Sequence, residues 1–363
     1  MIAGEPTGPG RPPWRRGDLL GFVVGLGISA ALSAAEGTSG CIRVSPENRP
    51  TWVTDAAWTD GGQILAIVDR NAGRILRFDE RGSSLGQLRR PGPGATALNE
   101  PLGIEGTDDG MVVQDSLDRF LWIADGRVER SVDFSGRTAV LEFLAEPNGL
   151  VIFGTWMGSP PVQGFLRLRI EPPGLAEVLL PVSGTSPSRR AYALHRPVLA
   201  RTGDGVYALT FDGRGSGIVR LPGRARLDSF PEAFEEPPTL PEGAGPEMLV
   251  PLYASVETSR MPIHLLGFGE RLYLTTREPR TSGGTRWQVH RIDPAADRLE
   301  ASIELPTSAA HLRVVPGPKA WALLEYGRVA AMGSRPLERL VLLPARWLTG
   351  TAPSGSLEAR CGE

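Results

Sequence analysis

Apolar and polar residues follow one another in a repeating order along most of the chain. The segment 53–59 (VTDAAWT) is followed by a Gly-containing turn, the almost wholly apolar segment 63–69 (QILAIVD), a polar turn and the alternating segment 74–80 (RILRFDE). The same order returns over residues 102–125, where LGIEGT leads to MVVQD and then to RFLWIAD. Short β-rich runs separated by Gly, Asp and Asn turns are typical of antiparallel hairpins joined end to end. The uninterrupted apolar second run predicts a strand that is buried on both faces.

Weaker copies of this unit continue toward the C-terminus. Each has an apolar run and then a second run: GLVIFGT with GFLRLRI, GVYALTFD with GIVRLP, RLYLTT with TRWQVHRID, and KAWALLE with ERLVLLP. Six units at a spacing of about 50 residues are consistent with propeller blades that carry loop insertions. We therefore predict an all-β fold, a six-bladed β-propeller over residues 51–350. In the alternative, a seven-bladed propeller, the extra blade would come from residues 232–260, but this Pro- and Glu-rich segment lacks the pattern and is predicted to be an inserted loop.

The first two units carry a cadence of "DGG/DDG", then "VD/QD", then "RI.RFDE.G", and Asn99-Glu100-Pro101 opens the second. This cadence resembles NHL-type six-bladed β-propellers, clearly over residues 51–136 and only in outline afterwards. Such repeats identify an architecture rather than an activity. The resemblance implies that an N-terminal strand within residues 36–50, around Ile42-Arg43-Val44, completes the last blade. Residues 351–363 would then form a C-terminal tail.

The first 35 residues have the features of an export signal. Arg11, Arg15 and Arg16 precede an apolar stretch over residues 19–35, which ends in the small residues Ser33-Ala34-Ala35. A basic region, a short apolar region and small residues at the cleavage point are the secretory pattern. The length of the apolar stretch also leaves an uncleaved anchor open. In either case we expect the folded part to be secreted, periplasmic or in the cell envelope.

The chain has two cysteines, Cys41 and Cys361, at opposite ends of the exported part. In an oxidising compartment they would form a disulfide if the fold brings the two ends together. The ring closure that the NHL resemblance implies would do so. Two alternatives stay open: Cys41 follows Thr38-Ser39-Gly40 and could be a lipidated anchor residue, or both cysteines could be free thiols.

Charge and motif content exclude several classes of function. Lys and Arg number 39 against 41 Asp and Glu, and without a basic block this balance argues against nucleic acid as the main partner. The chain has no HExxH, no GxSxG, no phosphate-loop GK and no DxDxDG calcium loop. Its four histidines show no metal-ligand spacing. We therefore expect no cofactor from sequence motifs alone.

One set of ionisable residues is nevertheless predicted to converge. When the innermost strands are aligned on the turns that follow them, five charged or titratable residues share one parity: Asp55, Glu105, Glu142, His264 and Arg313. The first four could hold a divalent cation in the central channel and support a metal-dependent hydrolase or lyase of lactonase-like type. In the alternative, the channel is solvated and Arg313 pairs with the acids.

Other candidates lie where loops connect the blades. His195, Arg196, Arg260 and His311 could form a basic rim for an anionic peptide or glycan, or could be ordinary solvated loop charges. Trp156 lies in a turn and is either an exposed contact or packed beneath its neighbours. The function that we predict is a non-enzymatic binding or scaffolding propeller that recognises a protein, peptide or glycan on its loop face, with the channel-sited enzyme as the alternative. Membrane attachment would occur only through an uncleaved N-terminus or a lipidated Cys41.

Overall fold

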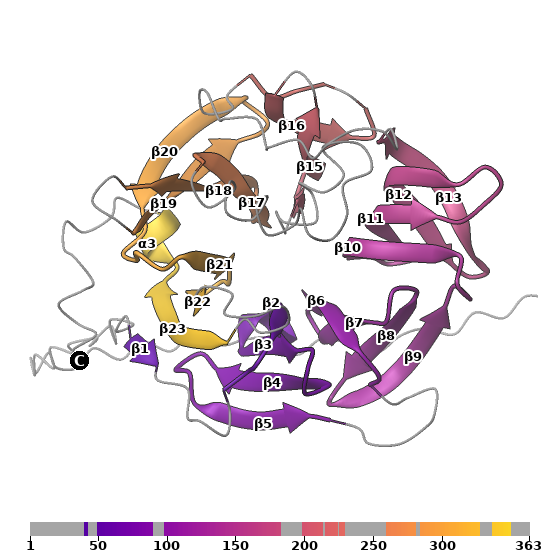
Figure 1. Ribbon diagram of the computed structural model, residues 1–363, viewed down its shortest axis with the longest axis horizontal. Coiled ribbons are helices and arrows are strands. Elements are labelled where there is room, and N and C mark those ends of the chain that lie inside the picture. Colours follow the sequence, from indigo (N-terminus) through magenta and orange to yellow (C-terminus); the bar gives the residue numbers. More distant parts are fainter. Residues whose placement is uncertain are drawn as a thin grey trace, which may run out of the picture. The chain divides into compact units, whose positions relative to one another are not determined.

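The computed structural model shows six small antiparallel sheets arranged around a centre, as in a six-bladed β-propeller (Figure 1). All described residues belong to the unit Gly37–Glu363. The described ranges are 40–42, 49–89, 98–182, 198–212, 215–223, 225–228, 259–280, 284–326 and 336–349. The predicted all-β, six-bladed architecture is thus confirmed.

The first three blades each contain four strands, in chain order from the centre outward. Blade 1 has β2 (Val53–Thr59), β3 (Ile64–Asp69), β4 (Arg74–Asp79) and β5 (Ser84–Leu88), with a short 3-10 turn η2 (Asp60–Gly62) after β2. Blade 2 has β6 (Pro101–Thr107), β7 (Gly110–Asp115), β8 (Arg119–Ala124) and β9 (Arg127–Asp133). Blade 3 has β10 (Thr138–Glu146), β11 (Gly149–Trp156), β12 (Val162–Ile170) and β13 (Pro173–Pro181).

The remaining blades follow the same plan with two variations. Blade 4 has three strands among the described residues, β14 (Leu199–Thr202), β15 (Gly205–Asp212) and β16 (Gly215–Leu221). Blade 5 has β17 (Met261–Phe268), β18 (Arg271–Pro279), β19 (Thr285–Asp293) and β20 (Arg298–Glu304). Blade 6 has β21 (His311–Val315), β22 (Ala320–Tyr326) and β23 (Leu337–Pro344), followed by the short helix α3 (Arg346–Thr349).

The ring closes through the N-terminus, as the NHL resemblance implied. Strand β1 (Gly40–Ile42) pairs antiparallel with β23 and is the outermost strand of blade 6, so that Cys41 lies opposite Val341 in the register. Cys361 lies outside the described residues, and the disulfide therefore stays a prediction. The predicted export signal over residues 1–35 and most of the predicted loop over residues 232–260 also lie outside the described residues.

The hydrophobic core is divided among the interfaces between blades. The second strands are buried along almost their whole length, as β7 and β22 illustrate, whereas the outer strand β5 is largely exposed. Between blades 6 and 1, for example, Trp58 and Leu76 pack with Leu340 in one cluster. Burying a large aliphatic side chain contributes roughly 1.5–3 kcal/mol. The apolar second strand therefore defines each blade, because it packs on both of its neighbours.

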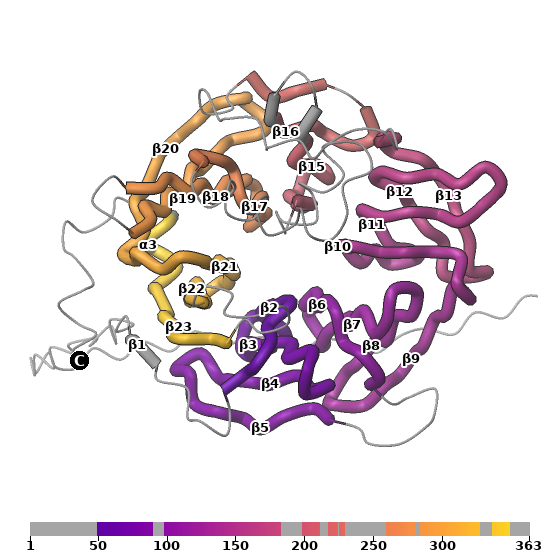
Figure 2. The backbone as a smooth tube through the Cα atoms, in the orientation of Figure 1, coloured from indigo at the N-terminus to yellow at the C-terminus, as the bar shows by residue number. Residues whose placement is uncertain are grey.

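The innermost strands contact their neighbours around the centre, in the order β2, β6, β10, β14, β17, β21 and back to β2 (Figure 2). Two glycines allow especially close approach of these strands. A Cβ on Gly106 in β6 would lie 1.7 Å from the carbonyl oxygen of Trp58 in β2, and one on Gly267 in β17 would lie 1.9 Å from that of Arg201 in β14. Only glycine fits at such positions. These contacts fix how the side chains of adjacent inner strands meet.

The ring has two faces that differ in the kind of connection they carry. We call "loop face" the side with the connections from each outermost strand to the next innermost strand and the turns between second and third strands. We call "turn face" the opposite side, with the turns between first and second and between third and fourth strands.

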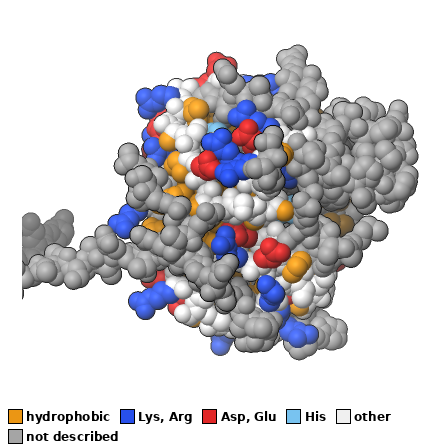
Figure 3. Space-filling model, turned by 60° about the vertical axis from the view of Figure 1, so that its left-hand side comes forward, with side chains coloured by type: hydrophobic (Ala, Val, Ile, Leu, Met, Phe, Trp, Pro, Cys, Tyr) orange, Lys and Arg blue, Asp and Glu red, His pale blue; other side chains and the backbone are white. Residues whose placement is uncertain are grey.

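On the outer side of blades 5 and 6, basic and acidic side chains are intermingled (Figure 3), as in the pairs that Arg286 forms with Glu278 and Glu304. Such exposed pairs contribute little stability.

Candidate functional site

All five predicted channel residues lie on innermost strands. Asp55 is in β2, Glu105 in β6, Glu142 in β10, His264 in β17 and Arg313 in β21. The sequence alignment of these strands is therefore consistent with their observed positions.

A β-bulge explains how several of these side chains are aimed. The pairing register shifts by one residue immediately before Asp55, Glu142 and His264, and before Gly103 in β6. A bulge adds a residue to one strand, bends it and re-aims the following side chain. After the bulge, the side chains of Asp55 and Glu142 are directed at the inner strand of the next blade.

Asp55 binds both of its neighbours in the ring. Its Oδ2 accepts a hydrogen bond from the backbone N–H of Ile104 in blade 2 at 2.9 Å, and its Oδ1 accepts one from Ala56 at 2.7 Å. Arg313 of blade 6 forms an ion pair with the same Oδ1. Asp55 thus links the last blade, the first blade and the second blade. This ion pair is the contact expected in the alternative in which Arg313 pairs with a channel acid.

Glu142 makes a two-point contact with blade 4. Its Oε2 accepts the backbone N–H of Val198 at 2.7 Å and its Oε1 accepts that of Leu199 at 2.9 Å. Hydrogen bonds to an ionised carboxylate are about twice as strong as neutral ones. Both carboxylate oxygens of Glu142 are therefore engaged at the start of β14.

Glu105 is held less completely. Its Oε2 accepts the backbone N–H of Ala145 in blade 3, and its Oε1 lies 3.9 Å from Nη1 of Arg201 in blade 4. Arg201 in turn donates from Nη1 to the carbonyl oxygen of Ala145 at 2.7 Å. Burial raises the pKa of Glu105 to about 7, against the opposing effects of the Ala145 hydrogen bond and of Arg201; Asp55 and Glu142 raise the pKa further. The side chain still keeps 22% exposure, so that protons can reach it from solvent.

The three acids thus share one role, which is to bind the backbone of the following blade's inner strand. We call Asp55, Glu105 and Glu142 the inner clasps. His264 is buried on β17 in blade 5, across the ring from Glu105 in blade 2 (Figure 1). Within the described part of the chain, no group of three or more His, Cys, Asp or Glu residues is arranged to hold a metal ion.

Three of the predicted loop-face residues are described, and each lies at the loop-face end of a strand. Arg260 directly precedes β17, His311 begins β21 and Trp156 ends β11, so these three belong to different blades. Trp156 is half-buried against the hydrophobic cluster of blades 2 and 3. The charge of Arg260 acts on His290, whose pKa is lowered to about 4, mainly by burial and secondly by Arg260. His195 and Arg196 lie outside the described residues.

Two exposed apolar side chains lie on the loop face, in turns that one connection joins, which the sequence analysis did not predict. Leu117 and Met157 are 52% and 53% exposed, in the second turns of blades 2 and 3. The carbonyl oxygen of Leu117 accepts the N–H of Val140 at 3.0 Å, and the N–H of Met157 donates to Arg137 at 2.7 Å. The connection between the blades therefore ties the two turns together. We call Leu117, Arg137, Trp156 and Met157 the loop-face platform.

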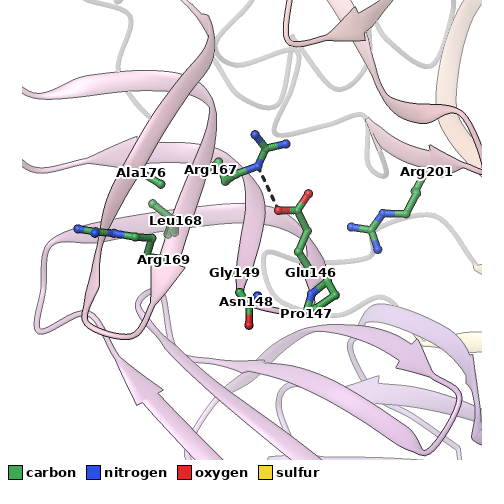
Figure 4. A pocket seen from close by; sticks show the side chains of 9 residues that line it. All are labelled: Glu146, Pro147, Asn148, Gly149, Arg167, Leu168, Arg169, Ala176 and Arg201. Carbon is green, nitrogen blue, oxygen red and sulfur yellow. Dashed lines mark hydrogen bonds and ion pairs between the residues drawn. The ribbon is translucent and has the colours of Figure 1, made fainter.

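An open pocket of about 550 Å³ lies on the turn face between blades 3 and 4 (Figure 4). Its lining residues are Glu146, Pro147, Asn148, Gly149, Arg167, Leu168, Arg169, Ala176 and Arg201. Arg201 belongs both to this pocket and to the Glu105 clasp. The sequence analysis did not predict this site, although the half-buried Arg167 and the exposed Arg169 alternate with buried residues in β12.

Comparisons with known proteins identify the fold and no family. No protein-family model matches the chain, and no curated protein sequence matches it significantly. The NHL-type assignment is therefore not confirmed by a family match.

Solved structures similar to this one include a member of the DUF4221 family from Bacteroides vulgatus, with 9% identity and a TM-score of 0.56 over 85% of this chain and 96% of that one. A putative exported protein from Bacteroides fragilis matches with 11% identity and a TM-score of 0.52 over 84% and 93%. A gluconolactonase from Xanthomonas campestris matches with 14% identity and a TM-score of 0.47 over 82% and 86%. At these identities the likeness concerns the fold alone.

Among the described residues, the structure contains no helix of the length and apolarity needed to cross a membrane.

Proposed function

We propose that this chain is an extracytoplasmic, non-enzymatic binding or scaffolding propeller that holds a partner on its loop face. The observation that carries the proposal is the use of the channel acids. Asp55 and Glu142 each engage both carboxylate oxygens, mostly with backbone N–H groups of adjacent blades. Each of these hydrogen bonds occupies a lone pair that a metal ion would otherwise use, and it directs the carboxylate at a neighbouring strand. We therefore interpret these channel acids as contacts that hold adjacent blades together.

The loop-face platform supports a protein or peptide as the partner. Leu117 and Met157 are large apolar side chains held in solvent by a hydrogen-bonded connection, and Arg137 is exposed between them in the chain. Contiguous exposed apolar patches mark interaction sites, and methionine adapts to varied contact surfaces. A glycan remains the other ligand class that we consider for this face. The export signal predicted for residues 1–35 supports an extracytoplasmic location.

Metal content separates this proposal from the metal-dependent hydrolase. We expect purified protein to carry less than stoichiometric calcium, magnesium or manganese by elemental analysis, and its melting temperature to be unchanged by chelation. A stoichiometric metal that is lost in the Glu142→Gln variant would overturn the proposal.

The partner itself can be located by photo-crosslinking in the native host. A photoreactive residue at position 157 should give one dominant crosslinked species, and the same residue at position 299, on the outer strand of blade 5 where Leu299 is 39% exposed, should not. Substituting Leu117→Ser in the 157 variant should reduce the crosslink strongly. Equal yields from the two positions would contradict a specific partner on the platform.

One observation favours a second function, a metal-free hydrolase or lyase. Glu105 has a pKa of about 7 and lies 3.9 Å from Arg201, which suits a general acid or base beside a positive charge. We expect Glu105→Gln to leave crosslinking at position 157 intact. If a hydrolytic activity on lactones or glycosides is found and disappears in this variant, the enzyme is the better description.

A further inference from the structure

The backbone around Met157 holds its side chain in solvent. Met157 is 53% exposed, whereas the other methionines in the described part of the chain, Met111 and Met261, are 4% and 0% exposed. The N–H of Met157 donates to the carbonyl oxygen of Arg137 at 2.7 Å, and the preceding Trp156 is half-buried against a hydrophobic cluster. The exposure of Met157 is therefore a property of a turn that is fixed on both sides.

Arg137 lies directly across from Met157. Thr138 of β10 pairs with Trp156 of β11, so that one step further along the two strands the register places Arg137 opposite Met157. Residues opposite one another in an antiparallel pair carry their Cβ atoms about 4.5–5.5 Å apart on the same face. Arg137 is exposed and forms no ion pair with a described residue. A guanidinium group is therefore within reach of the Met157 side chain.

The thioether of Met157 is accessible to an oxidant of the peroxide class. The sulfur lone pair attacks one peroxide oxygen, the O–O bond breaks, and the released hydroxide takes the proton of the transferred oxygen and leaves as water. The sulfur is oxidised by two electrons to the sulfoxide, and the peroxide is reduced by two electrons. Burial protects the sulfur atoms of Met111 and Met261 from the same reaction.

Oxidation changes what the Met157 side chain can contact. The thioether is apolar and a weak acceptor, whereas the sulfoxide oxygen is polar and accepts hydrogen bonds. The opposing Arg137 can donate to that oxygen, and hydrogen bonds from a charged donor are the stronger ones. An apolar contact surface is then replaced by a polar group beside an arginine.

We propose that Met157 is a modification site, at which oxidation by a peroxide to the sulfoxide releases the partner from the loop-face platform. A partner that packs on the thioether would have to bury the sulfoxide oxygen away from water and from Arg137, which weakens binding. Methionine sulfoxide reductases, with a thiol as the reductant, reverse the step. The proposal rests on the function proposed above, because it describes the regulation of the same surface.

Peptide mass spectrometry of the purified exported chain tests the site of modification. Under graded exposure to hydrogen peroxide, we expect Met157 to gain an oxygen atom at least about tenfold faster than Met111 and Met261, because access to the sulfur controls the rate. Equal rates at the three methionines would overturn the proposal.

Crosslinking in the presence of the native host's envelope proteins tests the effect on the partner. A photoreactive residue at the exposed position 159, in the same turn, leaves Met157 intact. Peroxide treatment should lower the crosslink yield at least about tenfold, because the oxidised side chain no longer suits an apolar contact, and reductase with a thiol should restore the yield.

A matched pair of variants assigns the effect to one sulfur atom. Met157→Leu keeps an apolar side chain without sulfur, so its crosslink yield should be unchanged by peroxide. Met261→Leu removes a buried sulfur and should lose the crosslink on oxidation as wild type does. In Arg137→Gln the loss on oxidation, relative to the untreated variant, should be smaller than in wild type; an equal loss would overturn the role of Arg137.

Two further results would overturn the proposal: an unchanged crosslink from position 159 after complete oxidation of Met157, or an equal loss of yield in Met157→Leu. Either result would leave the proposed function standing. Absence of a crosslink from positions 157 and 159 before oxidation would contradict the proposed function and this proposal with it, so that the two failures are distinguishable.

Discussion

Two sets of carboxylates hold backbone segments together in this ring, and they differ in how their charge is compensated. At the ends of the second strands of blades 1 and 2, Asp69 and Asp115 have fully buried side chains, each paired with an arginine. Asp115 Oδ1 accepts the N–H groups of Asn99 and Glu100 at 2.8 and 2.9 Å, and Asp69 binds the equivalent segment before β2. We call these two residues the outer clasps.

The inner clasp Glu105 lacks such compensation. Its nearest arginine, Arg201, is 3.9 Å away and is also bonded to a backbone carbonyl, and two further acids act on it electrostatically. The same chemical group therefore serves two purposes. Where an arginine neutralises it in a buried site, the carboxylate contributes stability. Where several acids lie around the channel, the pKa of the carboxylate rises toward neutrality.

The largest expected effect comes from breaking an outer clasp. Asp115→Ala would remove the ion pair of the buried Arg119 and leave two backbone N–H groups without their acceptor, and we expect a loss of about 3–5 kcal/mol of unfolding free energy. Urea unfolding followed by tryptophan fluorescence measures this change. The control is Asp109→Ala in the exposed turn after β6, which should stay within about 0.5 kcal/mol of wild type. A loss below about 1 kcal/mol for Asp115→Ala would show that the outer clasps are dispensable.

Glu105 is expected to make the stability of the folded protein depend on pH. The pKa of Glu105 is about 7 in the folded state, above its ordinary value of 4.5. The folded protein therefore binds the additional proton, and stability falls as pH rises from about 4.5 to 7. A shift of this size corresponds to about 3 kcal/mol. Glu105→Gln should equal wild type near pH 4.5 and exceed it in stability at pH 8. If the unfolding curves of the two proteins coincide at pH 8, ionised Glu105 does not destabilise the folded protein.

His290 acts in the opposite direction and must be measured alongside. Its pKa of about 4 lies below 6.5, so that the unfolded chain takes up the proton and stability falls as pH decreases from about 6.5 to 4. The His290 ring is held by Thr276 at 2.9 Å and Ser302 at 2.8 Å. We expect the two slopes to offset one another in wild type. His290→Gln should remove the acid-side loss and expose the Glu105 slope; an unchanged acid limb would refute this assignment.

The smallest effect is expected from weakening, rather than removing, an inner clasp. Glu142→Gln keeps one acceptor oxygen for Val198 or Leu199 and places an amide NH₂ opposite the other N–H, which should cost about 2 kcal/mol. Glu129→Gln on the exposed side of β9 is the matched control and should be neutral. Thermal unfolding at pH 8 measures both. A Glu142→Gln variant as stable as the control would remove the structural role of the inner clasps.

Much of the architecture could be predicted from local pattern. The cadence of an aspartate after the second strand and an arginine at the start of the third, as in Asp69 and Arg74, is now explained: the pair joins the third strand to the connection that enters the blade. The shared parity of Asp55, Glu105 and Glu142 was also predictable, because side chains alternate along a strand. Their partners were not, since Ile104, Ala145 and Val198 lie 40 to 56 residues away.

The sequence by itself determined the strands, their order and the side of each inner strand that carries charge, because alternation and turn residues act over a few positions. Only the tertiary structure decided what the charged side chains touch. The inner strands approach closely at Gly106 and Gly267. In the resulting arrangement of blades, the acids that were predicted as metal ligands bind the backbone of the neighbouring blade. The same packing of blade 3 against blade 4 places Arg167, Arg169 and Arg201 around one pocket, a juxtaposition that no local pattern encodes.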